Sequence, residues 1–167
     1  MHINDKYILF WNGLMSNWAH TPYWWDGCHF ENSEQHYMWL KAMHFGDEVT
    51  AKKILRETNP KIAKSLGRKV SGYDDDEWAK HRENAMFQAC YAKFTRNKKA
   101  HDFMMGLPKD KQFAEASPFD IIWGIGYEEH NPNAQDESTW RGQNLLGKVL
   151  TDVRSKILEQ SKTLFDI

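Results

Sequence analysis

The stretch SEQHYMWLKAMHFGD, residues 33–47, constrains the fold more than any other part of the chain. Its apolar side chains cover almost every direction of a helical wheel, and a helix of this kind is buried inside a domain. Local signals set its limits. Asn32 can cap the helix, Gln35 stands at the third helical position and can reach back, and Gly46 followed by Asp47 ends it and starts another.

This helix carries two charged residues, Glu34 and Lys41, seven positions apart. Because an α-helix advances about 100° per residue, the two side chains share one face. A buried carboxylate and a buried ammonium are costly to desolvate, so they must pair, lose their charges or line a wet cavity. From geometry alone, a partly exposed ion pair at the rim of a core helix is favoured over a functional site.

The remaining elements are short strands and amphipathic helices. Strands are expected in YILFWN, in QFAEA and in YWWDGCHF, where Asp26-Gly27 marks a turn. Hydrophobic spacing and caps predict helices within residues 47–57, 59–67, 75–94, 99–105 and 144–158. The fold class is therefore mainly α, an α+β fold with a minor β component. One domain is expected over residues 1–167, with its core at about 7–158.

Composition excludes several classes of protein. A formal charge of −1 over 167 residues provides no cationic field for duplex nucleic acid. The stretch MHINDKYILFWNG lacks the features of a signal peptide, and no apolar run approaches the length of a membrane span. Two cysteines make no disulfide framework, so a cytoplasmic location is expected. Most of the eight tryptophans are expected in the core, although aromatic pockets also stack nucleobases.

Metal and cofactor chemistry are not expected from the spacing of ligand residues. His36 and His44 lie eight positions apart, which is not the i,i+4 spacing of a helical zinc pair. The sequence has no P-loop and no G-x-S-x-G nucleophile elbow. We therefore expect no metal site and no cofactor.

Two short stretches could either bind a ligand or form ordinary turns and caps. In GLMSNW, the side chains of Ser16 and Asn17 can bond to backbone or to ligand, and a plain turn is equally expected. In WRGQNLLG, Gly142 and Asn144 open the last helix, whose free N–H groups could receive an anion. A plain N-cap is again as good an interpretation.

A third stretch, EASPFDIIWGIG, holds a carboxylate near an indole in an irregular loop. Asp120 and Trp123 are candidate base or sugar contacts. The pair Gly124 and Gly126 is weak evidence for phosphate binding, because the third glycine and the strand-turn-helix setting of a dinucleotide site are missing.

The chain contains in order LMSNW, SEQHYMWLKA with FGD close behind, LGRKV, KFTRN, EASPFDIIWGIG and WRGQNLLG followed by VR. This ordered set resembles the NADAR family, whose bacterial members are often called YbiA-like, from about Phe10 to Leu158. Each motif alone is weak, but six in one order with compatible spacings are specific. Two stretches depart from the pattern: a tryptophan-rich segment before the Glu34 helix and the polar EEHNPNAQDEST before Trp140. Both could change the substrate without changing the chemistry.

The resemblance implies a YbiA-like helical domain and N-glycosidase chemistry on ribosides. The expected substrates are ADP-ribose attached to a nucleobase, notably guanine in nucleic acid, or phosphoribosylamino-pyrimidine intermediates of riboflavin synthesis. Neither a membrane nor an obligate protein partner is expected.

The resemblance also implies roles for individual residues. Glu34 or Asp120 could direct water to an oxocarbenium-like C1, or Lys41 could attack C1 and form a Schiff base. Trp123 would stack on the base or sugar. The other residues expected to bind substrate, by holding ribose hydroxyls or phosphate, are Ser16, Asn17, Arg68, Lys93, Gly124, Gly126 and Asn144.

Two alternatives to an enzyme remain open at this point. A non-catalytic module that binds ADP-ribose or a nucleotide needs the same aromatic and cationic pocket, but not the pair of Glu34 and Lys41. A helical interaction module would instead use its tryptophans as an interface.

Overall fold

A computed structural model describes residues 1–163, with side chains to residue 161. Its mainly helical α+β fold, with small sheets, agrees with the expected class. The chain forms two compact units: residues 17–101, here called the helical unit, and residues 1–16 with the chain from Asp102 onward, here called the sheet unit. Helix α5 (Lys98–Gly106) crosses the boundary between them. No helix in the described range is long and apolar enough to cross a membrane.

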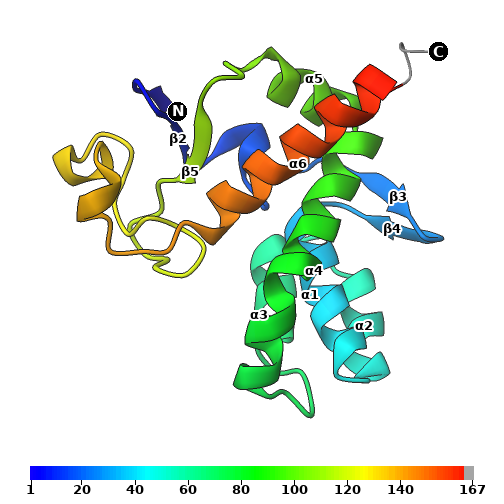
Figure 1. Ribbon diagram of the computed structural model, residues 1–167. Coiled ribbons are helices and arrows are strands. Elements are labelled where there is room, and N and C mark those ends of the chain that lie inside the picture. Colours follow the sequence, from blue (N-terminus) through cyan, green and yellow to red (C-terminus); the bar gives the residue numbers. More distant parts are fainter. Residues whose placement is uncertain (164–167) are drawn as a thin grey trace. The chain divides into compact units, whose positions relative to one another are not determined.

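The helical unit is built around α1 (Ser33–His44), which packs against α2 (Glu48–Leu55), α3 (Pro60–Gly67) and α4 (Asp75–Arg96) (Figure 1). Both apolar and polar side chains of α1 are buried. The helix predicted to be central is therefore confirmed as the one that the other three contact.

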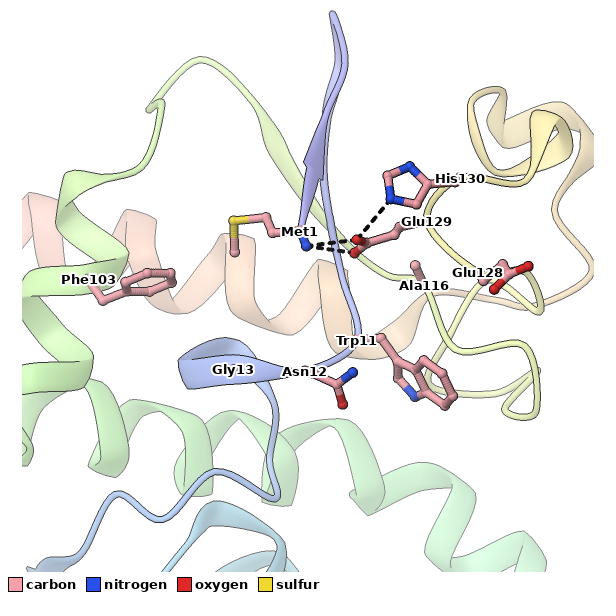
Figure 2. A pocket seen from close by; sticks show the side chains of 9 residues that line it. All are labelled: Met1, Trp11, Asn12, Gly13, Phe103, Ala116, Glu128, Glu129 and His130. Carbon is pink, nitrogen blue, oxygen red and sulfur yellow. Dashed lines mark hydrogen bonds and ion pairs between the residues drawn. The ribbon is translucent and has the colours of Figure 1, made fainter.

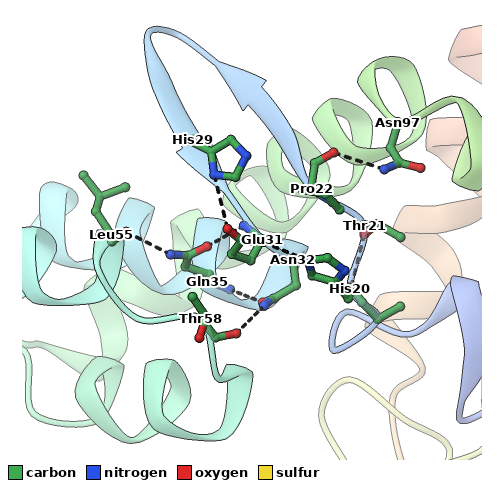
Figure 3. Close-up of polar contacts among 11 residues, drawn as sticks. His20, Thr21, Pro22, His29, Glu31, Asn32, Gln35, Leu55, Thr58 and Asn97 are labelled. Atoms are coloured by element: carbon green, nitrogen blue, oxygen red, sulfur yellow. Dashed lines mark hydrogen bonds and ion pairs between the residues drawn. The ribbon is translucent and has the colours of Figure 1, made fainter.

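The start of α1 is capped as the sequence predicts. The Asn32 side chain accepts the Gln35 N–H at 2.9 Å, and Gln35 reaches back to accept the Glu31 N–H at 2.7 Å. The Gln35 amide also donates to the carbonyls of Ile54, at 2.9 Å, and Leu55, at 3.3 Å. Figure 3 shows Gln35 reaching both the Glu31 backbone and the Leu55 carbonyl. One side chain thus caps α1 and attaches the end of α2 to it.

The predicted hairpin is also present. Strands β3 (Tyr23–Trp25) and β4 (Cys28–Phe30) pair antiparallel around Asp26 and Gly27, whose φ angles are +50° and +75°. A two-residue turn with both φ angles positive matches the right-handed twist of its strands, and this explains the Asp-Gly pair. The hairpin buries Tyr23 and Phe30 against Ala92 of α4.

Gly67 ends α3 for a steric reason that the cap rule does not contain. A Cβ on this residue would lie 2.0 Å from the sulfur of Met38, so a side chain here would require either the Met38 side chain or the packing of α3 on α1 to shift. The predicted end of the helix is confirmed, and the close packing explains why glycine stands there.

The sheet unit is organised by a parallel strand pair. Its sheet has the order β1 (His2–Ile3), β2 (Tyr7–Phe10), β5 (Gln112–Glu115), with β1 antiparallel to β2 and β5 parallel to it. Helix α6 (Leu145–Thr163) packs on β5, where the Thr151 hydroxyl accepts the Phe113 N–H at 3.1 Å (Figure 1). Arg154 donates to the carbonyls of Pro108 and Lys111 and so attaches the segment that precedes β5 to α6.

The buried His36 makes stability depend on pH. Its ring stacks on Phe30 with centroids 4.1 Å apart, its Nδ1 lies 3.1 Å from the Tyr23 hydroxyl, and burial lowers its pKa from 6.5 to about 3. Below pH 6.5 His36 becomes protonated in the unfolded chain but stays neutral in the folded chain down to about pH 3. The free energy of unfolding therefore falls as the pH falls. We expect a loss of about 2 kcal/mol between pH 7.5 and pH 5 from this residue.

His36→Phe tests this linkage, because it keeps the stacking and removes the titration. Urea unfolding of both proteins at several pH values should give a flatter dependence for the variant, by about that amount at pH 5. Parallel curves for the two proteins would show that His36 is not the source.

Candidate functional site

Glu34 is held in place through the backbone at the start of α1. Its N–H donates to the Asn17 carbonyl at 3.1 Å, and the neighbouring Ser33 hydroxyl donates to Asn17 Oδ1 at 2.9 Å. The Asn17 amide donates in turn to the Met86 sulfur at 3.2 Å. Asn17 therefore uses its polar atoms inside the protein, where they orient Glu34. This arrangement favours a positioning role for Asn17 over the ribose or phosphate contact expected from the resemblance.

Lys41 lies two turns further along α1, in an aromatic setting. Its side chain is buried, and its Nζ lies 4.1 Å from the centre of the Tyr73 ring, within the range of a cation–π contact. Tyr73 donates a hydrogen bond of 2.7 Å to Asp75 Oδ1. Burial lowers the pKa of Lys41, and the Arg68 charge lowers it further, while Asp75 opposes both effects. An unprotonated amine is thus more accessible at Lys41 than at an ordinary lysine.

Tyr37 lies on the same face of α1, between Glu34 and Lys41 in sequence. Its hydroxyl accepts a hydrogen bond from Trp78 Nε1 at 3.0 Å. Burial raises the pKa of Tyr37, the charge of Glu34 raises it further, and the charge of Arg82 opposes these effects. The Arg82 Nε is buried and has no hydrogen-bond partner among the described residues. A buried donor of this kind is costly unless a ligand or water meets it.

The helical unit therefore gathers two carboxylates (Glu34 and Asp75), two tyrosines and three cations around α1. Sequence reasoning had not named Tyr37 as a site residue. Tyr73 and Arg82 were missed, because they come from the segment before α4 and from α4 itself, where no spacing rule connects them to α1. Arg68 is exposed at the end of α3 and acts on Lys41 through its charge.

Lys93 differs from these residues because its side chain is 0% exposed. Burial lowers its pKa to about 8, although the neighbouring Cys90 opposes the shift. It lies on the buried side of α4. A phosphate contact for a fully enclosed amine finds no support in the structure.

In the sheet unit, Asp120 fixes the loop that carries Trp123. Its Oδ1 accepts the N–H groups of Ile122, at 2.9 Å, and Trp123, at 2.7 Å. This pattern is an Asx turn, in which a carboxylate orders the backbone that follows it. Asp120 thus has a structural function, whereas the catalytic roles of Asp120 and Trp123 stay predictions.

Gly124 and Gly126 are explained by packing. A Cβ on Gly124 would lie 2.8 Å from the Asp120 carbonyl oxygen, and Gly126 has a φ of +81°. The Gly126 N–H already donates to the Ser117 carbonyl at 3.0 Å. The loop needs glycine for these steric reasons, so the pair is no evidence for a phosphate site.

Asn144 joins the start of α6 to β5. Its side chain accepts the Glu115 N–H at 3.0 Å and donates to the Phe113 carbonyl at 3.1 Å. Every backbone N–H from Arg141 to Leu146 donates to a carbonyl between Ile121 and Ile125. The expectation of free N–H groups at this helix start is therefore wrong for Leu145 and Leu146. Asn144 is a structural bridge, and neither a plain N-cap nor an open anion site describes it.

The predicted site residues divide between the two units. Asn17, Glu34, Lys41, Arg68 and Lys93 belong to the helical unit, and Ser16, Asp120, Trp123, Gly124, Gly126 and Asn144 belong to the sheet unit. Ser16 follows the turn η1 (Gly13–Met15), and its N–H donates to the Gly13 carbonyl at 3.0 Å. That the residues of both units act in one site stays a prediction.

The sheet unit also contains a pocket of about 430 Å³ that sequence reasoning did not identify (Figure 2). At its wall the Met1 amino group contacts Glu129 at 2.9 Å, and Glu129 lies 3.4 Å from His130. No predicted site residue lines it; its lining residues are Met1, Trp11, Asn12, Gly13, Phe103, Ala116, Glu128, Glu129 and His130.

Comparison with known proteins identifies the family. The NADAR domain matches residues 9–158, nearly the whole chain and parts of both units. The chain belongs to the NADAR family, as its ordered motifs predicted. The fold is similar to the NMR structure of the Escherichia coli protein YbiA, with a TM-score of 0.74 and 25% identity over 96% of this chain and 89% of that one.

Three relatives show how far the sequence similarity extends. The chain is 39% identical over 130 residues to Protein irg-1 of Caenorhabditis elegans, a match covering 77% of this chain and 61% of the relative. It is 34% identical over 168 residues to N-glycosidase R617 of Acanthamoeba polyphaga mimivirus, covering 91% of this chain and 96% of the relative. The E. coli relative is named N-glycosidase YbiA and is 27% identical over 145 residues. The names of these last two proteins support the expected enzyme class.

The two interpretations of Asn144 predict different results. Asn144→Ala removes a buried acceptor and a buried donor and places alanine at a φ of +53°, so we expect a loss of about 3–5 kcal/mol in unfolding free energy. Asn144→Gly loses the same two hydrogen bonds, but glycine adopts the positive φ without strain. Its loss of unfolding free energy should therefore be smaller than that of Asn144→Ala. Urea unfolding measures both. A stable Asn144→Ala protein with only a raised KM would instead indicate a substrate contact.

Proposed function

We propose that the chain is an N-glycosidase that cleaves the bond between ribose C1 and a nitrogen. The substrate is ADP-ribose attached to a nucleobase, such as ADP-ribosyl-guanine in nucleic acid, or a phosphoribosylamino-pyrimidine intermediate of riboflavin synthesis. Membership of the NADAR family and the names of the relatives support the reaction class. This reaction needs no cofactor, no membrane and no obligate protein partner. Its expected location is the cytoplasm, because the two cysteines form no disulfide framework.

One observation carries the proposal: the amine of Lys41, with its lowered pKa, shares a helix face with the buried Glu34. Cleavage of an N-glycoside leaves an electron-poor C1 and a leaving nitrogen that needs a proton. A carboxylate can stabilise C1 or transfer a proton, and an unprotonated amine can act as a nucleophile. Both groups stand on α1, a helix fixed on three sides by its neighbours.

Two reaction routes use these groups differently. In the first, Lys41 Nζ attacks C1 as the C1–N bond breaks, and the base leaves with a proton. The sugar ring then opens to an imine on Lys41, and water hydrolyses the imine to release the ribose and the free amine. In the second, Glu34 or Asp120 directs water to C1 and Lys41 only binds the substrate. We favour the first route because burial and the Arg68 charge both lower the pKa of Lys41.

The cations near Lys41 suit the phosphate groups that both substrate classes carry. Arg68 acts on Lys41, and Arg82 acts on Tyr37 with a buried Nε that has no partner within the described residues. A guanidinium can meet a phosphate with two parallel hydrogen bonds. We therefore assign phosphate binding to Arg82 in addition to Arg68.

The second candidate is a module that binds ADP-ribose without cleaving it. The same cations favour it, because they would hold a diphosphate whether or not the sugar reacts. Mixing the protein with an ADP-ribosylated guanine oligonucleotide distinguishes the two: release of ADP-ribose means an enzyme, and binding without turnover means a binding module. Running phosphoribosylamino-pyrimidine beside it in one assay identifies the substrate class.

Borohydride trapping tests the role of Lys41. If the imine forms, reduction in the presence of substrate leaves a stable ribose adduct on the peptide that contains Lys41, seen by mass spectrometry. Lys41→Ala should abolish both turnover and adduct. Glu34→Gln should slow turnover by about 10²- to 10⁴-fold, the usual range for lost proton transfer, and still permit trapping.

Lys52→Ala is the matched control, since Lys52 is an exposed lysine of α2 in the same unit. It should change neither turnover nor trapping. Wild-type protein that turns over substrate without gaining mass at Lys41 would exclude the imine route and leave the water route.

A further inference from the structure

Three side chains with metal-binding atoms converge at the end of α1 and the start of α4. His44 stands in the last turn of α1, and Glu77 and His81 stand one helical turn apart on α4. Glu77 Oε1 lies 3.4 Å from His44 Nε2 and 2.9 Å from His81 Nε2. One ligand atom from each residue lies within 4.8 Å of the others.

These spacings are close to those around a zinc ion. With Zn–N and Zn–O distances of about 2.0–2.1 Å, tetrahedral geometry places neighbouring ligand atoms about 3.3 Å apart. The two distances to Glu77 Oε1 bracket this value, and the ligand atoms of His44 and His81 lie within 4.8 Å of each other, so rotamer adjustments of the two histidines would let all three atoms bind one ion. Side-chain exposures of 27% for His44, 43% for Glu77 and 46% for His81 leave an open side for water as a fourth ligand.

The neighbours of the cluster leave these ligand atoms available. Lys80 lies 3.6 Å from Glu77 Oε2, the oxygen that does not face the histidines. The His44 ring packs beside Trp78, with centroids 5.6 Å apart, and beside Phe45, at 4.9 Å. These contacts orient one ligand in advance, and a preorganised ligand binds a metal at a lower entropic cost.

A second group in the same unit shows that two histidines beside one carboxylate do not always lie near the same oxygen. Glu31 contacts His20 through Oε2 at 2.8 Å and His29 through Oε1 at 3.5 Å (Figure 3). Its two histidines therefore meet different oxygens. At Glu77 both histidines lie near the same oxygen, an arrangement that a single ion bound through that oxygen can use.

We propose that His44, Glu77 and His81 form a binding site for a divalent transition metal such as Zn²⁺. Two imidazoles and one carboxylate suit Zn²⁺, Ni²⁺ or Co²⁺ better than Mg²⁺, which prefers oxygen ligands in octahedral geometry. The ion links α1 to α4 across Trp78, whose indole N–H holds Tyr37. Its function is to stabilise this contact. The proposal is independent of the glycosidase chemistry, since none of its ligands is assigned to that reaction.

Isothermal titration of the full chain with ZnCl₂, after EDTA treatment and dialysis, tests the site. We expect one ion per chain, at least tenfold weaker binding in each of His44→Ala, Glu77→Gln and His81→Ala, and a thermal midpoint that Zn²⁺ raises in the wild type but not in these three variants. His20→Ala, from the group that does not converge, should bind like the wild type. MgCl₂ should produce no such change.

Nitrogen NMR of the histidine rings identifies the ligands directly. Zn²⁺ should shift the Nε2 signals of His44 and His81 and leave those of His20 and His29 unchanged. Wild-type affinity no higher than that of a His44→Ala/His81→Ala double variant, or shifts at other histidines only, would overturn the proposal. Glycosidase activity takes no part in either readout, so failure of one proposal does not affect the other.

Discussion

The buried start of α1 is the constraint on which the helical unit depends. A helix that begins inside a protein must satisfy its first N–H groups there, because a buried donor without a partner costs about 1–3 kcal/mol. The Asn17 carbonyl accepts the Glu34 N–H, and the Asn32 side chain accepts the Gln35 N–H. Gln35 then accepts from Glu31 and donates to the end of α2. The cap of one helix thereby determines where the preceding segment and the following helix must lie.

The same burial creates the electrostatics of the site. Once α1 is surrounded by three helices, its charged residues lose water, and the pKa values of Lys41 and Tyr37 shift in the direction that favours their neutral forms. Tyr73 follows the same rule, since burial first and its bond to Asp75 second raise its pKa to about 12. The packing that makes α1 central is thus also what makes its lysine a candidate nucleophile. In the helical unit, the burial of α1 therefore both stabilises the packing and shifts the pKa values of its titratable side chains.

Much of the fold could be predicted because its signals are local. Asn32 with Gln35, Asp26 with Gly27, and Asn59 with Pro60 each act within a few residues. The β2–β5 pairing joins segments that the whole helical unit separates in sequence, and no local signal specifies it.

The site was predictable only in part for the same reason. Glu34 and Lys41 could be read from one helical wheel, whereas Arg82 and Tyr73 reach α1 from elsewhere. Gly124, Gly126 and Asn144 suggested ligand contacts, but in the structure they meet backbone atoms. The glycines meet residues 4 and 9 positions away, and Asn144 meets residues 29 and 31 positions away, which no local pattern reveals. His44, Glu77 and His81 were missed likewise, since the spacing rule for histidine ligands examines one helix at a time.

Comparison of the two buried lysines shows why burial alone does not define a nucleophile. Burial lowers the pKa of both Lys41 and Lys93, and the shift at Lys93 is the one large enough to bring its pKa to about 8. By electrostatics alone Lys93 would be the better amine. Its side chain is 0% exposed, however, whereas that of Lys41 retains 9% exposure. A nucleophile must reach its substrate as well as lose its proton, and of these two lysines Lys41 is the one whose side chain is not fully enclosed, which is why the proposed role falls to it.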